Sequence, residues 1–317
     1  MDETARTDRL RGAVVGWAVG DALGAPFEFG LGGTFAARFP RAGGADGNEL
    51  CGGGGWDPGE ATDDTQMGLL VARSLLERGG LDLPEIFERF RRWIAADPKD
   101  FGTLTESVLT AGLPWDRAAE DYFAHNMYAA GNGSLMRAVP AALHYRHHDR
   151  DVRVDAARRI SALTHADPAT GWGCALYQEL LITALDGGDS EDLCAAVPEA
   201  LDLVEADQRE RWRIVLAPDW HPHDATESNG AVWPTLGTAL WALRTTDSFE
   251  EALRAAVNLG GDTDTVGAVT GGLAGAVHGL AAVPTRWAER VHTPLPGFGD
   301  HIWTAADFVV LADRRTA

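Results

Sequence analysis

Apolar residues recur along much of the chain at the three- and four-residue spacing of an amphipathic helix. The pattern is clear in MGLLVARSLLERGG (residues 67–80), LPEIFERFRRWIAAD (83–97) and SFEEALRAAVNLGG (248–261). Sustained alternation of apolar and polar residues, which is typical of strands, is hard to find. Runs of Gly and Pro break the helical segments, but none has the composition of an interdomain linker. The pattern predicts an all-α fold, built as a single compact multi-helix domain over residues 1–317.

Glycines follow a spacing of four near both ends of the chain. The two sets are Gly12, Gly16, Gly20 and Gly24, then Gly267, Gly271, Gly275 and Gly279. On a helix each set forms one ridge without side chains, which lets another backbone approach closely. An interior Gly costs up to about 1 kcal/mol of helix stability relative to Ala, so the repeated spacing favours a required close contact. The alternative is a drift of composition toward Gly and Ala.

Two acidic clusters open apolar runs, ATDDTQMGLL at residues 61–70 and DTDT at residues 262–265. Thr and Asp are common helix caps, and Gln66 extends a capping-box-like pattern, so a helix start explains either cluster alone. Carboxylate and hydroxyl oxygens are also hard ligands suited to Mg²⁺, Mn²⁺ or Ca²⁺. If the two helix starts face each other, their four aspartates could hold two divalent cations, and without cations they would repel strongly.

Two further stretches are candidates for the same site. GDALGAPFEF carries Asp21 and Glu28, each of which, taken alone, is interpreted as a solvated carboxylate. GNGSLMR (residues 131–137) is a glycine-containing turn that could present N–H groups to a phosphate, with Arg137 nearby. It lacks the third Gly of a dinucleotide fingerprint, and an ordinary loop is the alternative.

Charge and cysteine content narrow the classes of partner. The chain has 27 Lys and Arg against 47 Asp and Glu, a formal net charge of −20, so nucleic acid or an anionic membrane surface would be repelled. Three cysteines without a CxxC pair, and no leader-like N-terminus, predict a cytoplasmic protein. Residues 266–283 lack charged side chains, but their Gly and Ala content, His278 and the adjoining acidic cluster argue against a membrane span.

In chain order, GDALGAPFEF, ATDDTQM, GNGSLMR, THADP and NLGGDTDTVGAVTGGLAG resemble the ADP-ribosylglycohydrolase family, which includes the dinitrogen reductase-activating glycohydrolases. The resemblance runs from about Gly12 to Gly297. It implies an all-α domain with a binuclear metal cleft that holds two divalent cations, Mg²⁺ or Mn²⁺. The ligands implied by the resemblance are Thr62, Asp63, Asp64, Asp262, Asp264 and Thr265.

The resemblance also implies roles for residues around the metals. Glu28 matches a position with a gating or ligand role, and Asp100 matches an aspartate close to the scissile bond, so both are catalytic candidates. Cleavage through an oxocarbenium-like state needs nearby negative charge and an acid or base, which either could supply. The residues expected along the diphosphate and in the pocket are Gly131, Asn132, Gly133, Ser134 and His165.

Two departures from the family pattern stand out. Ala231 occupies a position where relatives often place an aromatic residue, and Trp233 is the replacement ring that the sequence offers. The run APDWHPHDATESNG, with Asp219, His221, His223 and Asp224, could suggest a second metal site, although loops of this kind are usually solvated.

The function implied is divalent-metal-dependent hydrolysis of the bond between ADP-ribose and arginine on a modified protein. The alternatives are ADP-ribosylserine or a small ADP-ribose conjugate as substrate, a non-catalytic crystallin-like member of the family, and a phosphohydrolase that uses the same cations. The expected partner is an ADP-ribosylated protein or conjugate, with no nucleic acid and no membrane. The oligomeric state is left open.

Overall fold

A computed structural model describes residues 2–126 and 128–314. The described chain is almost entirely helical, as predicted. Its α-helices are α1 (Glu3–Gly24), α2 (Thr34–Arg38), α3 (Asp63–Arg78), α4 (Leu83–Ile94), α5 (Thr103–Thr110), α6 (Ala118–His125), α7 (Val139–Tyr145), α8 (Arg150–Ser161), α9 (Pro168–Leu185), α10 (Ser190–Leu201), α11 (Ala206–Val215), α12 (Val232–Thr245), α13 (Phe249–Val257), α14 (Thr263–His278), α15 (Thr285–Ala288) and α16 (Ala305–Asp313). Short 3₁₀ turns are η1 (Ala25–Phe27), η2 (Pro222–Asp224) and η3 (Leu280–Ala282), and strands β1 (His292–Thr293) and β2 (Trp303–Thr304) pair antiparallel.

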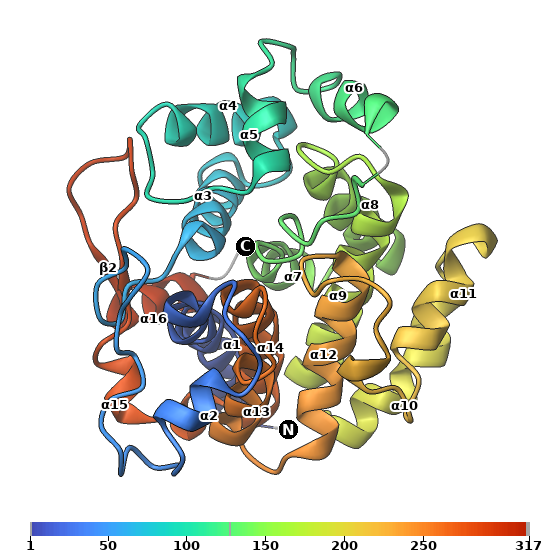
Figure 1. Ribbon diagram of the computed structural model, residues 1–317. Coiled ribbons are helices and arrows are strands. Elements are labelled where there is room, and N and C mark those ends of the chain that lie inside the picture. Colours follow the sequence, from blue (N-terminus) through green and yellow to red (C-terminus); the bar gives the residue numbers. More distant parts are fainter. Residues whose placement is uncertain (1, 127, 315–317) are drawn as a thin grey trace.

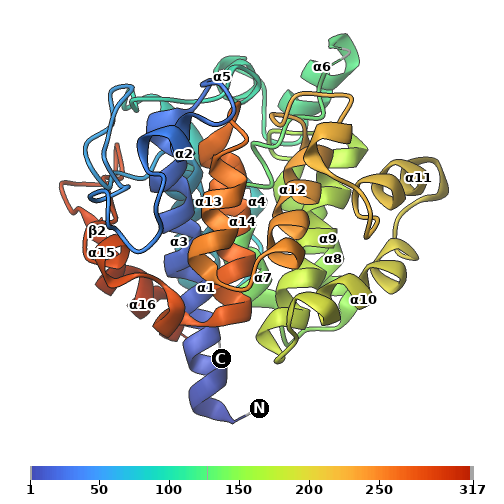
Figure 2. The same ribbon diagram turned by 60° about the horizontal axis from the view of Figure 1, so that its bottom comes forward.

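Helices α1 and α14 pack against each other in the middle of the fold, with α10 and α11 on one side and α15 and α16 on the other (Figures 1 and 2). Their two glycine ridges form the contact. A Cβ atom added to Gly16 would lie 2.4 Å from the carbonyl oxygen of Gly271, and one added to Gly12 would lie 2.3 Å from that of Gly275. The ridges are therefore required by backbone contact, which excludes the alternative of compositional drift.

The pairing of the two ridges is antiparallel. Gly12 and Gly16, early in α1, face Gly275 and Gly271, late in α14, while Gly24 at the end of α1 faces Thr263 at the start of α14. The end of α1 and the beginning of α14 consequently meet, although they are far apart in sequence. This contact brings the Asp21 to Glu28 stretch next to the second acidic cluster.

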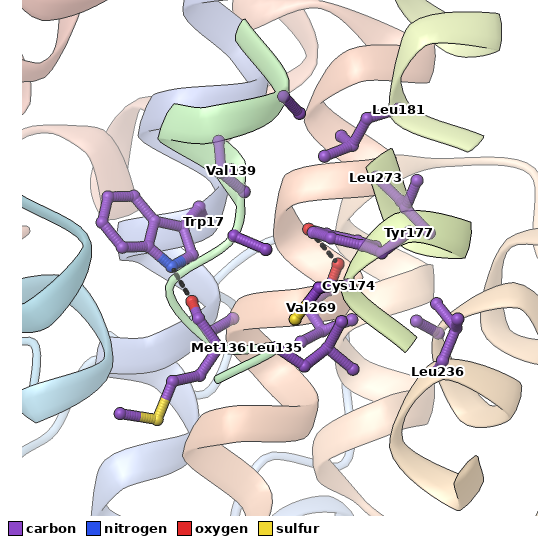
Figure 3. Packing of buried hydrophobic residues seen from close by; sticks show 14 of the residues in the cluster. Trp17, Leu135, Met136, Val139, Cys174, Tyr177, Leu181, Leu236, Val269 and Leu273 are labelled. Atoms are coloured by element: carbon purple, nitrogen blue, oxygen red, sulfur yellow. Dashed lines mark hydrogen bonds between the residues drawn. The ribbon is translucent and has the colours of Figure 1, made fainter. Parts of the chain in front are cut away.

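One cluster of buried apolar residues extends from Leu10 to Ala312 and surrounds the two central helices. Two aromatic side chains of this cluster also form hydrogen bonds to backbone carbonyls. Figure 3 shows the Trp17 indole N–H donating to the carbonyl of Met136 at 2.8 Å and the Tyr177 hydroxyl donating to the carbonyl of Val269 at 3.0 Å. These bonds hold the turn before α7 against α1, and α9 against α14. That residues 1–317 form one domain stays a prediction.

Helix α14 begins at Thr263, so it covers most of the uncharged stretch from residue 266 to 283. Within the described chain, no helix combines the length and apolarity that crossing a membrane requires.

Candidate active site

A cavity of about 440 Å³ opens where the end of α1, the beginnings of α3 and α14, and the loops before α5 and α7 converge. Most of the predicted site residues line it. The lining residues are Glu28, Phe29, Asp63, Asp64, Asp100, Phe101, Gly102, Thr103, Leu104, Thr105, Gly131, Asn132, Gly133, Met136, His165, Gly230, Asp262, Asp264 and Thr265.

Backbone pairing places Glu28 beside the second acidic cluster. The N–H of Phe29 donates to the carbonyl of Gly261 at 2.7 Å, and the N–H of Gly261 donates to the carbonyl of Gly30 at 3.0 Å. Phe29 has a φ of 57°, a left-handed conformation that non-glycine residues rarely adopt. This short bridge fixes the Glu28 turn next to Asp262.

Glu28, Asp262 and Asp264 form the tightest acidic group. Each offers one carboxylate oxygen, and these oxygens lie within 4.8 Å of one another; among residues 2–126 and 128–314, this is the group identified as able to hold a metal ion. Asn132 donates its amide N–H to Asp262 at 2.9 Å, and the side-chain oxygen of Asn229 accepts from the Asp262 backbone N–H at 3.0 Å. Two asparagines therefore fix Asp262 in place.

The first acidic cluster is both a helix cap and part of the site. Thr62 is the N-cap of α3, and its hydroxyl accepts from the N–H of Asp64 at 3.3 Å. Asp64 also accepts from the Thr265 hydroxyl at 3.3 Å, which joins the two clusters. The capping-box interpretation of Gln66 is wrong, because its amide accepts from the indole N–H of Trp93 in the interior.

Burial makes the clustered carboxyls hold protons tightly. Burial, and then the charges of Asp100 and other carboxylates, raises the pKa of Glu28 to about 8 and that of Asp63 to about 8. Burial also raises the pKa values of Asp64 and Asp264 well above the ordinary range, with neighbouring aspartates adding to the effect. Multiply charged cations would relieve this repulsion.

The donor set fits hard divalent cations. Its lining groups are carboxylates and the hydroxyl of Thr265, which are ligands that Mg²⁺ and Mn²⁺ accept. In the part of the chain that the structure describes, the buried Oδ2 of Asp64 has no hydrogen-bond partner, and a cation would satisfy it. Thr62 differs from the other predicted ligands, because it is fully buried and is not part of the cavity lining.

Most of the catalytic and pocket candidates line the cavity. Asp100 lines the same cavity, and one of its carboxylate oxygens accepts from the N–H of Phe101 at 2.8 Å. The cavity is also lined by Gly131, Asn132, Gly133 and His165. Ser134 does not line the cavity, and its hydroxyl accepts a bond from Ser161 at 2.7 Å in the interior.

Two residues have surroundings that sequence reasoning missed. Asp21 is fully buried instead of solvated, and it accepts bonds from the backbone N–H groups of Thr62 and Thr65. Arg137 is fully buried behind the glycine turn, where it donates to the carbonyl of Gly133, so it does not face the cavity as an anion ligand. The sequence signal for Asp21 is that it shares the motif GDALGAPFEF with Glu28.

Comparison with known proteins agrees with this geometry. A family model described as ADP-ribosylglycohydrolase matches residues 2–317. The chain belongs to the ADP-ribosylglycohydrolase family. It is 34% identical over 291 residues to the ADP-ribosyl-[dinitrogen reductase] glycohydrolase of Rhodospirillum rubrum, with 90% of both chains covered.

Two further relatives support the same assignment. The ADP-ribosylarginine hydrolase Tri1 of Pseudomonas putida is 31% identical over 299 residues, which cover 90% of this chain and 74% of the relative. A solved structure described as an ADP-ribosylglycohydrolase-related protein complex superposes with a TM-score of 0.77 at 35% identity, covering 98% of this chain and 97% of the other. The predicted all-α fold and the prediction of an ADP-ribosylglycohydrolase enzyme are confirmed.

The two departures from the family pattern lie in the loop before α12 and at the start of that helix. Ala231 pairs with Gly131 in an isolated bridge at the edge of the site, and Trp233 lies nearby with its ring beneath the guanidinium of Arg211. His221 and Asp224 form a short capped turn, in which the ring nitrogen of His221 accepts from the N–H of His223. In the described chain this loop is therefore a capping turn and not a metal group.

Proposed function

We propose that this ADP-ribosylglycohydrolase hydrolyses the N-glycosidic bond between ADP-ribose and an arginine side chain of a modified protein, releasing ADP-ribose. The observation that carries the proposal is the meeting of Glu28, Asp262 and Asp264 in one cavity with Asp63 and Asp64, beside the glycine turn at residues 131–133. The name of the Tri1 relative supports arginine as the linkage.

Two divalent cations, Mg²⁺ or Mn²⁺, are proposed as cofactors. Asp63, Asp64, Asp262, Asp264 and Thr265 would hold them, with Thr62 as the sixth predicted ligand. Glu28 belongs to the tight acidic group, so its position also favours a ligand role over a direct proton-transfer role. When bound, the cations would supply Lewis-acid charge for oxygen atoms of the substrate.

Asp100 is the candidate general acid and base. It lines the cavity, yet it does not belong to the group whose oxygens lie within 4.8 Å of one another. In the reaction, water contributes the hydroxyl that ends on the anomeric carbon, and the departing guanidine nitrogen receives the proton. A carboxylate beside the anomeric carbon both stabilises an oxocarbenium-like state and transfers that proton.

The rest of ADP-ribose has room to extend past the glycine turn. A second cavity of about 690 Å³ shares Gly131 and Gly230 with the first. Its lining includes Tyr128, Arg211 and Trp233, so a planar base is the natural occupant. We propose that the diphosphate crosses at Gly131 to Gly133, where backbone without side chains allows a close approach.

The test is release of free ADP-ribose from an arginine-ADP-ribosylated protein, with Mg²⁺, Mn²⁺ or a chelator in separate samples. Metal-dependent release from this substrate, and none from a serine-linked one, is the expected result. Release from serine alone, or from small conjugates alone, would overturn the arginine assignment. Release of inorganic phosphate without ADP-ribose would overturn the glycosidase assignment.

A further inference from the structure

Behind the glycine turn, a buried chain of hydrogen bonds connects an arginine to the histidine of the cavity wall. A guanidinium N–H of Arg137 donates to the hydroxyl oxygen of Thr164 at 2.6 Å. The same hydroxyl lies 2.8 Å from Nδ1 of His165. All three side chains are buried, so solvent does not compete for these bonds. The connection sets the direction in which each hydrogen points.

The direction follows from what each group can donate. A guanidinium has only donors, so Thr164 must accept from Arg137 and keeps one hydrogen of its own to donate. Within the described residues, the Thr164 hydroxyl has no further partner besides Nδ1 of His165. If Nδ1 carried a hydrogen instead, the hydrogen of Thr164 would be buried without an acceptor, which is costly.

We infer that Arg137, acting through Thr164, fixes His165 as the tautomer with its hydrogen on Nε2, so that His165 donates a hydrogen bond to an oxygen atom of the substrate. Arg137 and Thr164 are positioning residues in this arrangement, and His165 makes the contact. The inference that the acceptor belongs to a substrate rests on the proposed function. The tautomer itself does not depend on it.

The surroundings of Nε2 fit this role. A Cβ atom added to Gly133 would lie 3.1 Å from Nε2, and one added to Gly131 would lie 3.4 Å from it, so the ring edge packs on the glycine turn. Among the described residues, none is hydrogen-bonded to Nε2, and His165 lines the cavity. Burial and the charge of Arg137 hold the pKa of His165 well below its usual value, which keeps the ring neutral.

The neutral Nε2–H group of His165 differs from a charged donor in which substrate atoms it favours. A neutral N–H contributes direction with little long-range attraction, so it favours an oxygen in one place over any passing anion. The net charge of −20 would already weaken the capture of a free anion. The hydrogen-bonded chain from Arg137 through Thr164 to His165, here called the relay, therefore sets where a diphosphate or ribose oxygen lies as the substrate passes the glycine turn.

The first test is ¹⁵N NMR of the histidine side chains of the Mg²⁺-loaded protein, with the His165 signals assigned by their loss in His165→Gln. The expected spectrum has an unprotonated Nδ1 and a protonated Nε2. Thr164→Val, which removes the hydroxyl but keeps the shape, should give a mixture of tautomers, and Thr164→Ser should restore the wild-type signals. Thr270→Val is the matched control, because it removes a buried hydroxyl that has no partner within the described chain.

The second test is the dissociation constant for ADP-ribose, measured by calorimetry on the same proteins. Thr164→Val should weaken binding by about three- to tenfold, with recovery in Thr164→Ser and no change in Thr270→Val. A protonated Nδ1 in the wild type, or an unchanged tautomer in Thr164→Val, would overturn the relay. An intact relay in a protein that neither binds nor releases ADP-ribose would overturn the proposed function and the substrate contact, but not the tautomer.

Discussion

Asp21 on α1 accepts two hydrogen bonds from Thr65 on α3, one from the backbone N–H at 3.0 Å and one from the hydroxyl at 2.5 Å. The same carboxylate accepts from the N–H of Thr62. An Asp side chain from one helix therefore caps the first turn of another, and that turn carries Asp63 and Asp64. Asp21 fixes the position of the first acidic cluster without lining the cavity.

We predict that Asp21→Asn weakens both folding and metal binding, because an amide N–H then faces backbone donors. Loss of bonds to a charged acceptor should lower the free energy of unfolding by about 1.5–3 kcal/mol. Mg²⁺ affinity measured by calorimetry should fall as well. Asp8→Asn is the control on the same helix, because Asp8 is not part of the site and accepts an exposed 3.3 Å bond. Unchanged Mg²⁺ affinity in Asp21→Asn would contradict the capping role.

Asp264→Ala should abolish turnover while leaving a folded helical protein. Asp264 belongs to the tight acidic group, and its removal takes away a proposed metal ligand together with a source of repulsion. The metal-free variant should therefore melt no lower than the metal-free wild type. Bound metal measured by elemental analysis and ADP-ribose release would check the first expectation, and thermal unfolding the second. Normal release by this variant would exclude the site.

Without metal, the protein should lose stability as the pH rises from about 5 to 8.5. The folded pKa of Asp63, about 8, lies above its ordinary value of 3.8, so its contribution is complete at low pH and is lost as the pH passes through 8. The raised pKa of Glu28 likewise makes its contribution to stability fall as the pH rises. Melting temperatures in chelator should fall across this range, and Mg²⁺ should reduce the fall. Asp63→Asn should show a smaller fall, and a wild-type curve that rises would contradict the burial of these groups.

Gly271→Ala should destabilise the protein and impair the site together. Its added methyl would lie 2.1 Å from the carbonyl oxygen of Gly16, so α1 and α14 must separate. Overpacking of this kind costs about 1–3 kcal/mol or more. Gly80→Ala is the control, because nothing lies within 4 Å of its added methyl. Denaturant unfolding should show no more than about 0.5 kcal/mol of change for Gly80→Ala, and equal effects of the two variants would contradict the close contact.

The sequence predicts the two acidic clusters and the glycine ridges well because each depends on local chemistry at fixed spacing. The Gly ridge of α1 needs only a partner without side chains, and the chain contains one. Burial is harder to predict from sequence. Asp21 in GDALGAPFEF has the local sequence of a solvated carboxylate, and only its contact with Thr65 on α3 shows that it is buried. Arg137 shows the same limit, because the direction of a long side chain depends on packing around Phe90 and Thr164.

The site also depends on contacts that no sequence motif predicts. Asn229 accepts from the N–H of Asp262 and donates to the carbonyl of Gly260 at 2.8 Å, yet its segment looks like an ordinary polar loop. Its spacing from Asp262 carries no periodic signal, because a whole helix pair lies between them. Only the folded chain shows that the loop before α12 supports the start of α14.

Arg211→Ala should raise the KM for ADP-ribosylated protein by about tenfold while changing kcat little. The guanidinium carbon of Arg211 lies 3.3 Å from the centre of the Trp233 ring, and Glu227 pairs with it, so the plane of the guanidinium is held in place. In this chain Ala231 provides no ring, and the stacked pair of Arg211 and Trp233 offers a planar surface in the second cavity. Stacking of a base is worth about 1–3 kcal/mol, which corresponds to about tenfold or more.

Two comparisons separate stacking from charge and from damage to the fold. Arg211→Lys keeps the charge but loses the plane, so its KM should resemble that of Arg211→Ala if a base stacks there. A substrate trimmed by a phosphodiesterase to phosphoribosyl-arginine lacks the base, so wild type and Arg211→Ala should then have equal KM values. Arg213→Ala, on the same helix and paired with Glu210 at the surface, should behave as wild type with both substrates. A KM increase that persists with the trimmed substrate would place the base elsewhere, because the lost contact would then belong to the phosphate or ribose.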